Sequence, residues 1–199
     1  YILKGTIYKL EGNVKLAISS YETAVQQDPN YYLTYLYLGS LYEYENNPIC
    51  IEKYMTAYQL QPKNTEVIYA LAFAKEKFGQ EAAAQRLYRK MTKVDSTFAD
   101  GFFHLGYLAQ FTFNQPDSAM FYYKKAVHLN PDDSKLYYKI ATTYMLEKQW
   151  QPAIKQLENA MEKLNLTTEN KRKQNYFGKH HKYIKNCNFC NHVKFSLYL

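Results

Sequence analysis

The sequence predicts an all-α protein, a solenoid built from antiparallel helix pairs. Three observations support this fold class. The chain aligns with itself at an offset of about 34 residues, which gives five copies of one pattern. Each copy divides into two amphipathic stretches with apolar residues at helical spacing. One such pair cannot bury its own apolar face, but three or more stacked pairs can, so five copies are enough for a stable array.

The copies share their aromatic, small and proline positions. We expect them at residues 1–31, 32–64, 65–98, 99–133 and 134–167, with the first copy truncated at its start. The second copy reads Tyr35, Leu38, Gly39, Tyr42, Cys50, Tyr54, Ala57 and Pro62. The fourth copy reads Phe102, Leu105, Gly106, Ala119, Tyr123, Ala126 and Pro131. The third copy departs most, with Lys75 at the second tyrosine position and Ser96 in place of the proline.

These residues resemble the tetratricopeptide repeat, whose pattern is a large aromatic residue, Leu-Gly, Tyr, Ala, an aromatic residue and a closing Pro. The resemblance covers residues 1–165. It implies a right-handed superhelical solenoid with a concave groove lined by the first helix of each pair. It also implies a scaffold that binds other proteins.

Turn and capping residues agree with these boundaries. Gly12 and Gly79 fall in turns within a copy, where a positive φ is tolerated. Asn47 and Asp133 precede helices and are expected to cap them. Prolines fall in the expected first turn of second helices, where a missing N–H is harmless: Pro48, Pro116 and Pro152. Small residues are expected where the paired helices approach closely, as Gly39 with Cys50, Ala72 with Ala84, Gly106 with Ala119, and Ala141 with Ala153.

The resemblance places the ligand-facing residues on the first helices. Carried over by position, that face holds Leu33, Leu36, Tyr37 and Ser40; Glu66, Tyr69, Ala70 and Phe73; Asp100, Phe103, His104 and Tyr107; and Lys135, Tyr138, Lys139 and Thr142. From these we predict that the partner-binding residues are Leu33, Leu36, Tyr37, Tyr69, Phe73, Phe103, His104, Tyr107, Lys135, Tyr138 and Lys139.

An aromatic face suits a partner with apolar or aromatic anchors, either an extended peptide or an amphipathic helix. The alternative is that several of these rings only fill the core between repeats. A clamp for a terminal carboxylate, known from related repeats, is disfavoured. Lys135 and Lys139 could supply charge, but Tyr69, Phe73 and His104 stand where that clamp has Asn.

Charge separates the body from the tail. The net charge is +7, yet residues 1–165 hold 18 Lys and Arg against 17 Asp and Glu, whereas residues 166–199 hold 7 against 1. The basic tail includes rings as well as cations, which suggests a nucleic-acid-associated protein as the alternative function. A polar capping helix over residues 168–185 is the simpler interpretation. A purely structural or oligomerising array is a third possibility, and the oligomeric state stays open.

The sequence predicts neither an enzyme nor a cofactor. It contains no Gly-rich phosphate loop, no H-E-x-x-H and no G-x-S-x-G motif. Cys187, Cys190 and His192 have zinc-ligand residue types, but one Cys pair without a second is a weak signal, so we predict no metal site.

No stretch reaches the roughly 18 to 20 apolar residues of a membrane-spanning helix, so we expect a soluble chain. The first residue is Tyr1 and falls inside a repeat, so we expect that the sequence is incomplete at its N-terminus. A cytoplasmic location would follow if no signal lies upstream.

Overall fold

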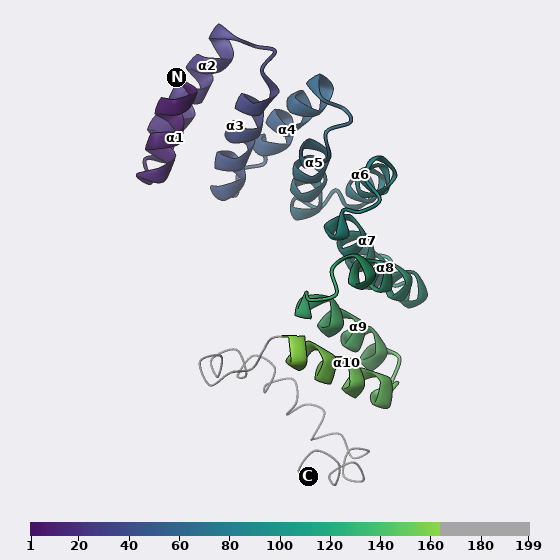
Figure 1. Ribbon diagram of the computed structural model, residues 1–199. Helices are drawn as coiled ribbons and strands as arrows, with labels where there is room; N and C mark the ends of the chain where they lie inside the picture. The colour runs from purple at the N-terminus through teal and green to yellow at the C-terminus, as the bar shows by residue number, and fades with distance from the viewer. Residues whose placement is uncertain (164–199) are drawn as a thin grey trace. The chain divides into compact units, whose positions relative to one another are not determined.

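A computed structural model describes residues 1–163, and this part of the chain is all-α (Figure 1). It contains α1 (Ile2–Leu10), α2 (Val14–Gln27), α3 (Tyr32–Tyr44), α4 (Ile49–Leu60), α5 (Thr65–Lys77), α6 (Glu81–Val94), α7 (Ala99–Phe111), α8 (Pro116–Leu129), α9 (Ser134–Leu146) and α10 (Trp150–Lys163). No strand occurs among the described residues. The predicted all-α fold class is confirmed.

The chain divides into two compact units. The first, Tyr1–Pro131, contains α1 to α8, and the second begins at Asp132 and contains α9 and α10 in its described part. Within the first unit the helices pack as the pairs α1–α2, α3–α4, α5–α6 and α7–α8, and each pair packs on the next. In the second unit α9 packs on α10. Repeated helix pairs of this kind form the helical-repeat solenoid that the sequence predicts.

The core of the first unit runs through consecutive pairs because each apolar cluster takes residues from more than one pair. One cluster joins α2 to α3, a second joins α3 and α4 to α5, and a third joins α5 and α6 to α7. Their buried members include Tyr21 and Leu38 in the first, Leu36, Tyr54 and Leu71 in the second, and Ile68, Tyr88 and Leu105 in the third.

A glycine of the first helix lies under a buried tyrosine of the second helix in three pairs. A Cβ atom on Gly39 would stand 2.4 Å from the Tyr54 ring, and one on Gly106 would stand 2.6 Å from the Tyr123 ring. Gly5 has the same relation to Tyr21. The expectation from sequence paired Gly39 with Cys50 and Gly106 with Ala119. Cys50 and Ala119 are both buried. The tyrosine ring, however, is the group that leaves no room for a Cβ atom and so requires glycine.

The turn inside every pair contains one residue in the left-handed region. Gly12 and Gly79 have φ of 77° and 74°, as their positions predict. Asn46 and Asn114 take the equivalent positions with φ of 54° and 49°, and Lys148 does so with φ of 59°. The turn geometry is therefore set by the repeat, whatever residue occupies the site.

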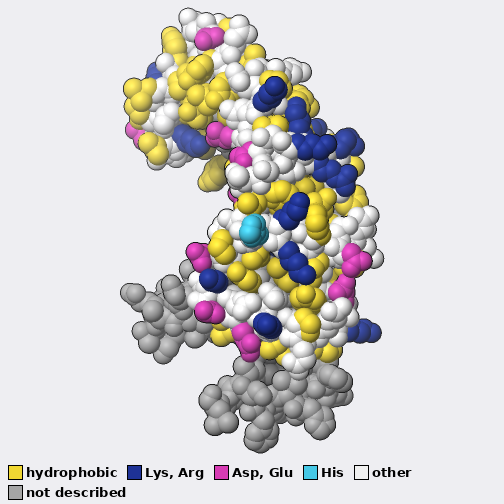
Figure 2. All heavy atoms as spheres, turned by 45° about the vertical axis from the view of Figure 1, so that its right-hand side comes forward, with side chains coloured by type: hydrophobic (Ala, Val, Ile, Leu, Met, Phe, Trp, Pro, Cys, Tyr) yellow, Lys and Arg dark blue, Asp and Glu magenta, His cyan; other side chains and the backbone are white. Residues whose placement is uncertain are grey.

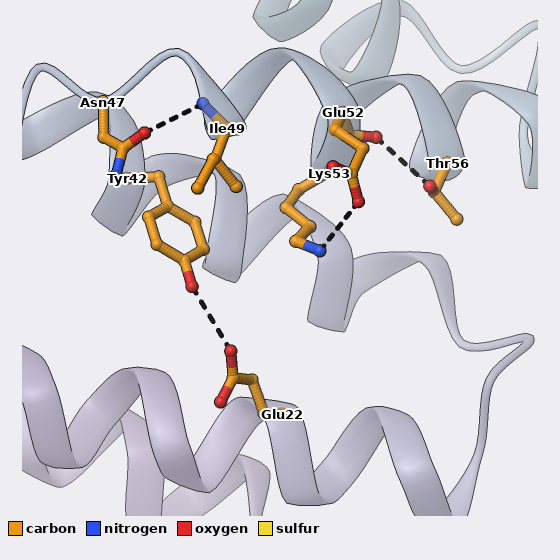
Figure 3. Close-up of polar contacts among 7 residues, drawn as sticks. All are labelled: Glu22, Tyr42, Asn47, Ile49, Glu52, Lys53 and Thr56. Atoms are coloured by element: carbon orange, nitrogen blue, oxygen red, sulfur yellow. Dashed lines mark hydrogen bonds and ion pairs between the residues drawn. The ribbon is translucent and has the colours of Figure 1, made fainter.

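Side-chain caps fix several helix starts. Asn47 Oδ1 accepts a hydrogen bond from the Ile49 N–H over 3.0 Å at the start of α4 (Figure 3). Asp133 Oδ1 accepts one from the Lys135 N–H over 2.9 Å at the start of α9. Both caps were predicted, and each satisfies an N–H that the helix itself leaves without a partner.

The three prolines lie at the starts of second helices. Pro116 is the first residue of α8, Pro48 directly precedes α4, and Pro152 is the third residue of α10. None of these positions needs an N–H for the helical ladder, which explains why proline is accepted there.

Polar contacts also connect consecutive pairs. The Tyr42 hydroxyl of α3 donates to Glu22 Oε1 of α2 over 3.3 Å (Figure 3). Burial, and then the neighbouring Glu22 carboxylate, raise the pKa of Tyr42 above its ordinary value. The hydroxyl therefore stays protonated and keeps its role as a donor at neutral pH.

Candidate functional site

The ligand-facing residues expected in the first unit lie on α3, α5 and α7, and we call this set the first-helix face: Leu33, Leu36, Tyr37, Ser40, Glu66, Tyr69, Ala70, Phe73, Asp100, Phe103, His104 and Tyr107. Six of its predicted partner-binding side chains are half-buried and expose part of their surface: Leu33, Tyr37, Tyr69, Phe73, Phe103 and Tyr107. Leu36 and His104 are buried, with 7% and 8% exposure. Solvent therefore reaches the half-buried six, whereas Leu36 and His104 expose less than a tenth of their surface.

Rings from α5 and α7 form one cluster on this face. The Tyr69 and Phe73 ring centroids of α5 are 6.1 Å apart, with the planes inclined by 17°. The His104 ring of α7 stands edge-on to both, at 5.6 Å and 5.7 Å, and edge-on to Phe103 at 5.1 Å. One turn of helix separates Tyr69 from Phe73, which places both rings on one side of α5. The cluster therefore presents a nearly continuous aromatic surface.

A polar network holds His104 in place beneath these rings. Its Nδ1 lies 2.9 Å from Glu76 Oε2, and its Nε2 lies 3.3 Å from the Tyr69 hydroxyl. The Tyr88 hydroxyl donates to the same Glu76 oxygen over 2.8 Å, and the Tyr88 ring stacks on His104 at 4.8 Å. With both ring nitrogens in contact, His104 is fixed in orientation and positions Tyr69.

Nearby carboxylates affect the hydroxyls of this network. Burial, followed by Asp100, Glu76 and Glu43, raises the pKa of Tyr69 to about 12. Burial, followed by Glu76, also raises the pKa of Tyr88. Both hydroxyls are therefore neutral donors across the physiological range, since burial first and then the nearby carboxylates disfavour the tyrosinate anion.

The part of the face on α3 combines one ring with a hydroxyl. The Tyr37 ring lies 5.4 Å from Tyr21 of α2, which fixes its outward position. Ser40 Oγ donates to the Tyr37 carbonyl over 2.8 Å and accepts from Lys9 Nζ over 3.3 Å. This end of the face is thus more polar than the cluster on α5 and α7.

At the far end of α7, Tyr107 lies 4.9 Å from Phe111, ring to ring, along the same helix. Phe103, one turn earlier, lies 6.1 Å from Tyr123 of α8. Phe103 and Tyr107 are thus each packed against a second ring, which limits their rotation.

The remaining predicted residues lie on α9 in the second unit. Lys135 is exposed, and Tyr138, Lys139 and Thr142 are half-buried. Burial lowers the pKa of Lys139. The Thr142 hydroxyl donates to the Lys139 carbonyl over 2.7 Å. These side chains form a mixed basic and aromatic face of α9.

Sequence reasoning missed Glu76 and Tyr88 as supports of the face. A signal was available, because an acceptor follows the small residue of the first helix by four positions in three copies. These acceptors are Glu43, Glu76 and Gln110. The side-chain oxygen of each accepts a hydrogen bond from the hydroxyl of the tyrosine on the second helix. The pattern predicts a polar support under the face.

The described residues offer little for metal or covalent chemistry. They contain no group of three or more His, Cys, Asp and Glu side chains that could hold a metal ion. The Cys50 thiol is buried, and burial followed by Glu43 raises its pKa to about 11, so it is a poor nucleophile at neutral pH. In the same part of the chain, every helix is too short or too polar to cross a membrane.

Several predictions fall on residues 164–199, which lie outside the described part of the chain. They are the capping helix over 168–185, nucleic-acid binding by the basic tail, and the question of a metal at Cys187, Cys190 and His192.

Comparisons with known proteins agree on the fold. A family model described as "Tetratricopeptide repeat" matches residues 1–31 and 99–133. A crystal structure of MamA is 25% identical, with a TM-score of 0.75 over 85% of this chain and 96% of that one. Pseudomonas aeruginosa pilF is 20% identical, with a TM-score of 0.72 over 82% of this chain and 74% of that one.

A third similar structure is YrrB, described as a TPR protein with an unusual peptide-binding site. It is 16% identical, with a TM-score of 0.67 over 88% of this chain and 90% of that one. No curated protein sequence matches the chain.

Proposed function

We propose that the chain, which is similar to the tetratricopeptide-repeat family in residues 1–31 and 99–133 and in its fold, is an interaction scaffold. Its first-helix face binds a peptide or an amphipathic helix of a partner protein. The partner supplies apolar or aromatic anchors. The residues that contact it in the first unit are Leu33, Tyr37, Tyr69, Phe73, Phe103 and Tyr107, with Leu36 and His104 beneath them.

The observation that carries this proposal is the ring cluster of Tyr69, Phe73 and Phe103 around His104. Half-exposed aromatic rings bury much area on binding and lose little rotamer freedom. Here the loss is reduced further, because each ring already packs against another and His104 is held by Glu76. A preorganised surface of this kind favours binding.

For the second unit by itself, we propose that Lys135, Tyr138 and Lys139 on α9 bind a partner segment. Two cations and one aromatic ring suit a partner segment that contains both an acidic residue and an apolar anchor residue. The proposal is for binding without catalysis. The peptide-binding site described for YrrB is compatible with such a role for the fold.

A peptide selection tests the first-helix face. We would select ligands for the full chain from a random displayed peptide library and measure their affinity by fluorescence anisotropy. The blocking variant is Ser40→Glu with Ala70→Glu, which adds charge and bulk at two partly exposed small residues of the face. The matched control is Ser19→Glu with Ala82→Glu, which makes the same kind of change at positions of α2 and α6 away from that face.

The selected peptides are expected to carry apolar or aromatic anchors and to bind the blocking variant at least about tenfold more weakly than the control. Both variants must melt like the unmodified protein by circular dichroism. Equal affinity for both variants would show that the first-helix face is not the binding surface.

A further inference from the structure

The outer side of α6 carries a stripe of four cations. Arg86, Arg89, Lys90 and Lys93 follow one another at intervals of three, one and three residues. At this spacing the side chains lie on one face of the helix and extend over about 10 Å of its axis. The opposite face of α6 is buried through Ala84, Tyr88 and Met91. We call the four residues the basic stripe.

The basic stripe is open to solvent and is not neutralised. Arg86, Arg89 and Lys93 are exposed and Lys90 is half-buried. No ion pair with Asp or Glu involves these four in the described part of the chain. Glu81 and Asp95 lie at the two ends of α6, and the Asp95 carboxylate accepts hydrogen bonds from Thr97. Figure 2 shows dark blue side chains gathered along one edge of the upper part of the view.

Lys90 is held in position by an aromatic ring of the preceding pair. Its ammonium lies 4.5 Å from the centroid of the Tyr58 ring on α4 and donates a hydrogen bond to the Tyr58 hydroxyl. A cation–π contact of this kind orders a side chain that otherwise has many rotamers. A partner would therefore meet an ammonium group that is already placed.

The next second helix repeats the arrangement. In α8 the residues 35 positions further on are Phe121, Lys124, Lys125 and His128, and all four are exposed. The Lys125 ammonium lies 4.7 Å from the centroid of the Phe121 ring and 5.4 Å from that of Phe102. Tyr122 of α8 packs against the apolar cluster that includes α6 residues. Because α8 is the second helix of the next pair, its cations take the repeat positions that the basic stripe takes on α6.

We propose that the basic stripe and Lys124 and Lys125 bind an acidic segment of a protein partner, at a site separate from the first-helix face. The carboxylates of an acidic helix recur at the same intervals of three and four residues, so they can pair with the stripe in register. Arg86 and Arg89 can each hold a carboxylate by two parallel hydrogen bonds.

Two other anionic ligands fit the surface less well. Single-stranded nucleic acid uses exposed ring faces to stack bases, but lysine ammonium groups already lie over Tyr58 and Phe121. A helix that lies in a bilayer surface needs an apolar face toward the lipid, and the apolar face of α6 is buried in the core.

The test uses the full chain and a fluorescein-labelled peptide of about 16 residues, made of alternating Glu-Glu and Ala-Ala pairs. Its binding to Arg86→Glu with Arg89→Glu is compared with binding to Lys15→Glu with Lys63→Glu. Both doubles change the net charge equally, and the second pair is exposed on α2 and in the α4–α5 turn. Carbodiimide coupling followed by mass spectrometry then identifies the lysines that touch the carboxylates.

We expect the peptide to bind the Arg86→Glu with Arg89→Glu variant at least about tenfold more weakly than the control variant. In the unmodified protein, we expect the peptide to cross-link to Lys90, Lys93, Lys124 and Lys125. An equal loss of peptide affinity in both double variants would show that only the net charge matters, and this result would overturn the proposal. Cross-links confined to the lysines of residues 166–199 would overturn it in favour of the tail. Preferential binding of a poly-dT oligonucleotide or of anionic lipid vesicles through Arg86 and Arg89, with no binding of the peptide, would assign the surface to another class of ligand and overturn it too.

Discussion

The Tyr88 hydroxyl on α6 donates a hydrogen bond to Glu76 Oε2 on α5 over 2.8 Å. The relationship recurs in the neighbouring pairs, where Tyr54 donates to Glu43 over 2.8 Å and Tyr123 donates to Gln110 over 2.9 Å. In all three pairs this hydrogen bond locks the second helix to the first. In the α3–α4 and α7–α8 pairs the tyrosine ring also covers a glycine that lies one helical turn before the acceptor.

This lock predicts an order of stability costs. Tyr88→Phe removes a hydrogen bond to a carboxylate and is expected to lower the free energy of unfolding by about 1.5 to 3 kcal/mol. Tyr123→Phe removes one to a neutral amide and should cost about 0.5 to 1.5 kcal/mol. Urea unfolding followed by circular dichroism measures both. A larger cost for Tyr123→Phe would mean that the charge of the acceptor is not what strengthens the bond.

The same tyrosines predict sensitivity to alkaline pH. Burial raises the pKa values of Tyr54, Tyr88 and Tyr123 in the folded protein, and that of Tyr69 to about 12, above the ordinary value near 10. The unfolded chain thus loses these protons first. Their contribution to stability is complete below about pH 10 and is lost as the pH rises above it.

We therefore expect the melting temperature to fall between pH 10 and pH 12, with tyrosinate absorbance near 295 nm rising together with the loss of helical signal. Tyrosines that all ionise near pH 10 in a chain with unchanged circular dichroism would contradict the burial described above.

The close contact under Tyr54 predicts the effect of adding a methyl group. Gly39→Ala would place a Cβ 2.4 Å from the ring and force α3 and α4 apart. We expect a net loss of about 1 to 3 kcal/mol, since overpacking outweighs the better helix propensity of Ala. Ala82→Gly, at an exposed position of α6, is the control for propensity alone. Thermal unfolding that leaves Gly39→Ala as stable as the unmodified protein would show that the helices have room to separate.

Repeat spacing in the sequence was enough to predict the fold, because five copies in register leave one way to bury their apolar faces. It also placed the caps at Asn47 and Asp133, where side-chain chemistry decides the helix start. It could not predict that Leu36 and His104 are buried, since a position on the first helix does not reveal which neighbour covers it. The basic stripe was equally hidden, because periodicity specifies the buried face of α6 and leaves its outer residues free to vary.

Thr34 on α3 offers a route to greater stability. Its side chain is fully buried, and within the described residues its hydroxyl oxygen has no hydrogen-bond partner. Thr34→Val keeps the shape and removes the cost of burying that polar group, so we expect a gain of about 1 kcal/mol. Thr143→Val is the comparison, because the Thr143 hydroxyl is buried but donates to the Lys139 carbonyl over 3.0 Å. Chemical denaturation should rank the first variant above the unmodified protein and the second at or below it.

Lys148 differs from the four other left-handed turn residues of the described chain, which are Gly or Asn. An L-residue with a Cβ pays roughly 1 to 2 kcal/mol in this region, while glycine adopts it readily. Lys148→Gly removes that strain but makes the unfolded chain more flexible, so we expect a net gain of about 0.5 to 1 kcal/mol. Hydrogen exchange of the α9 and α10 amides measures it, because the turn joins these two helices. Lys148→Ala keeps the Cβ and should give no gain; protection that rises equally in both variants would attribute the effect to the lost lysine charge instead of to the backbone.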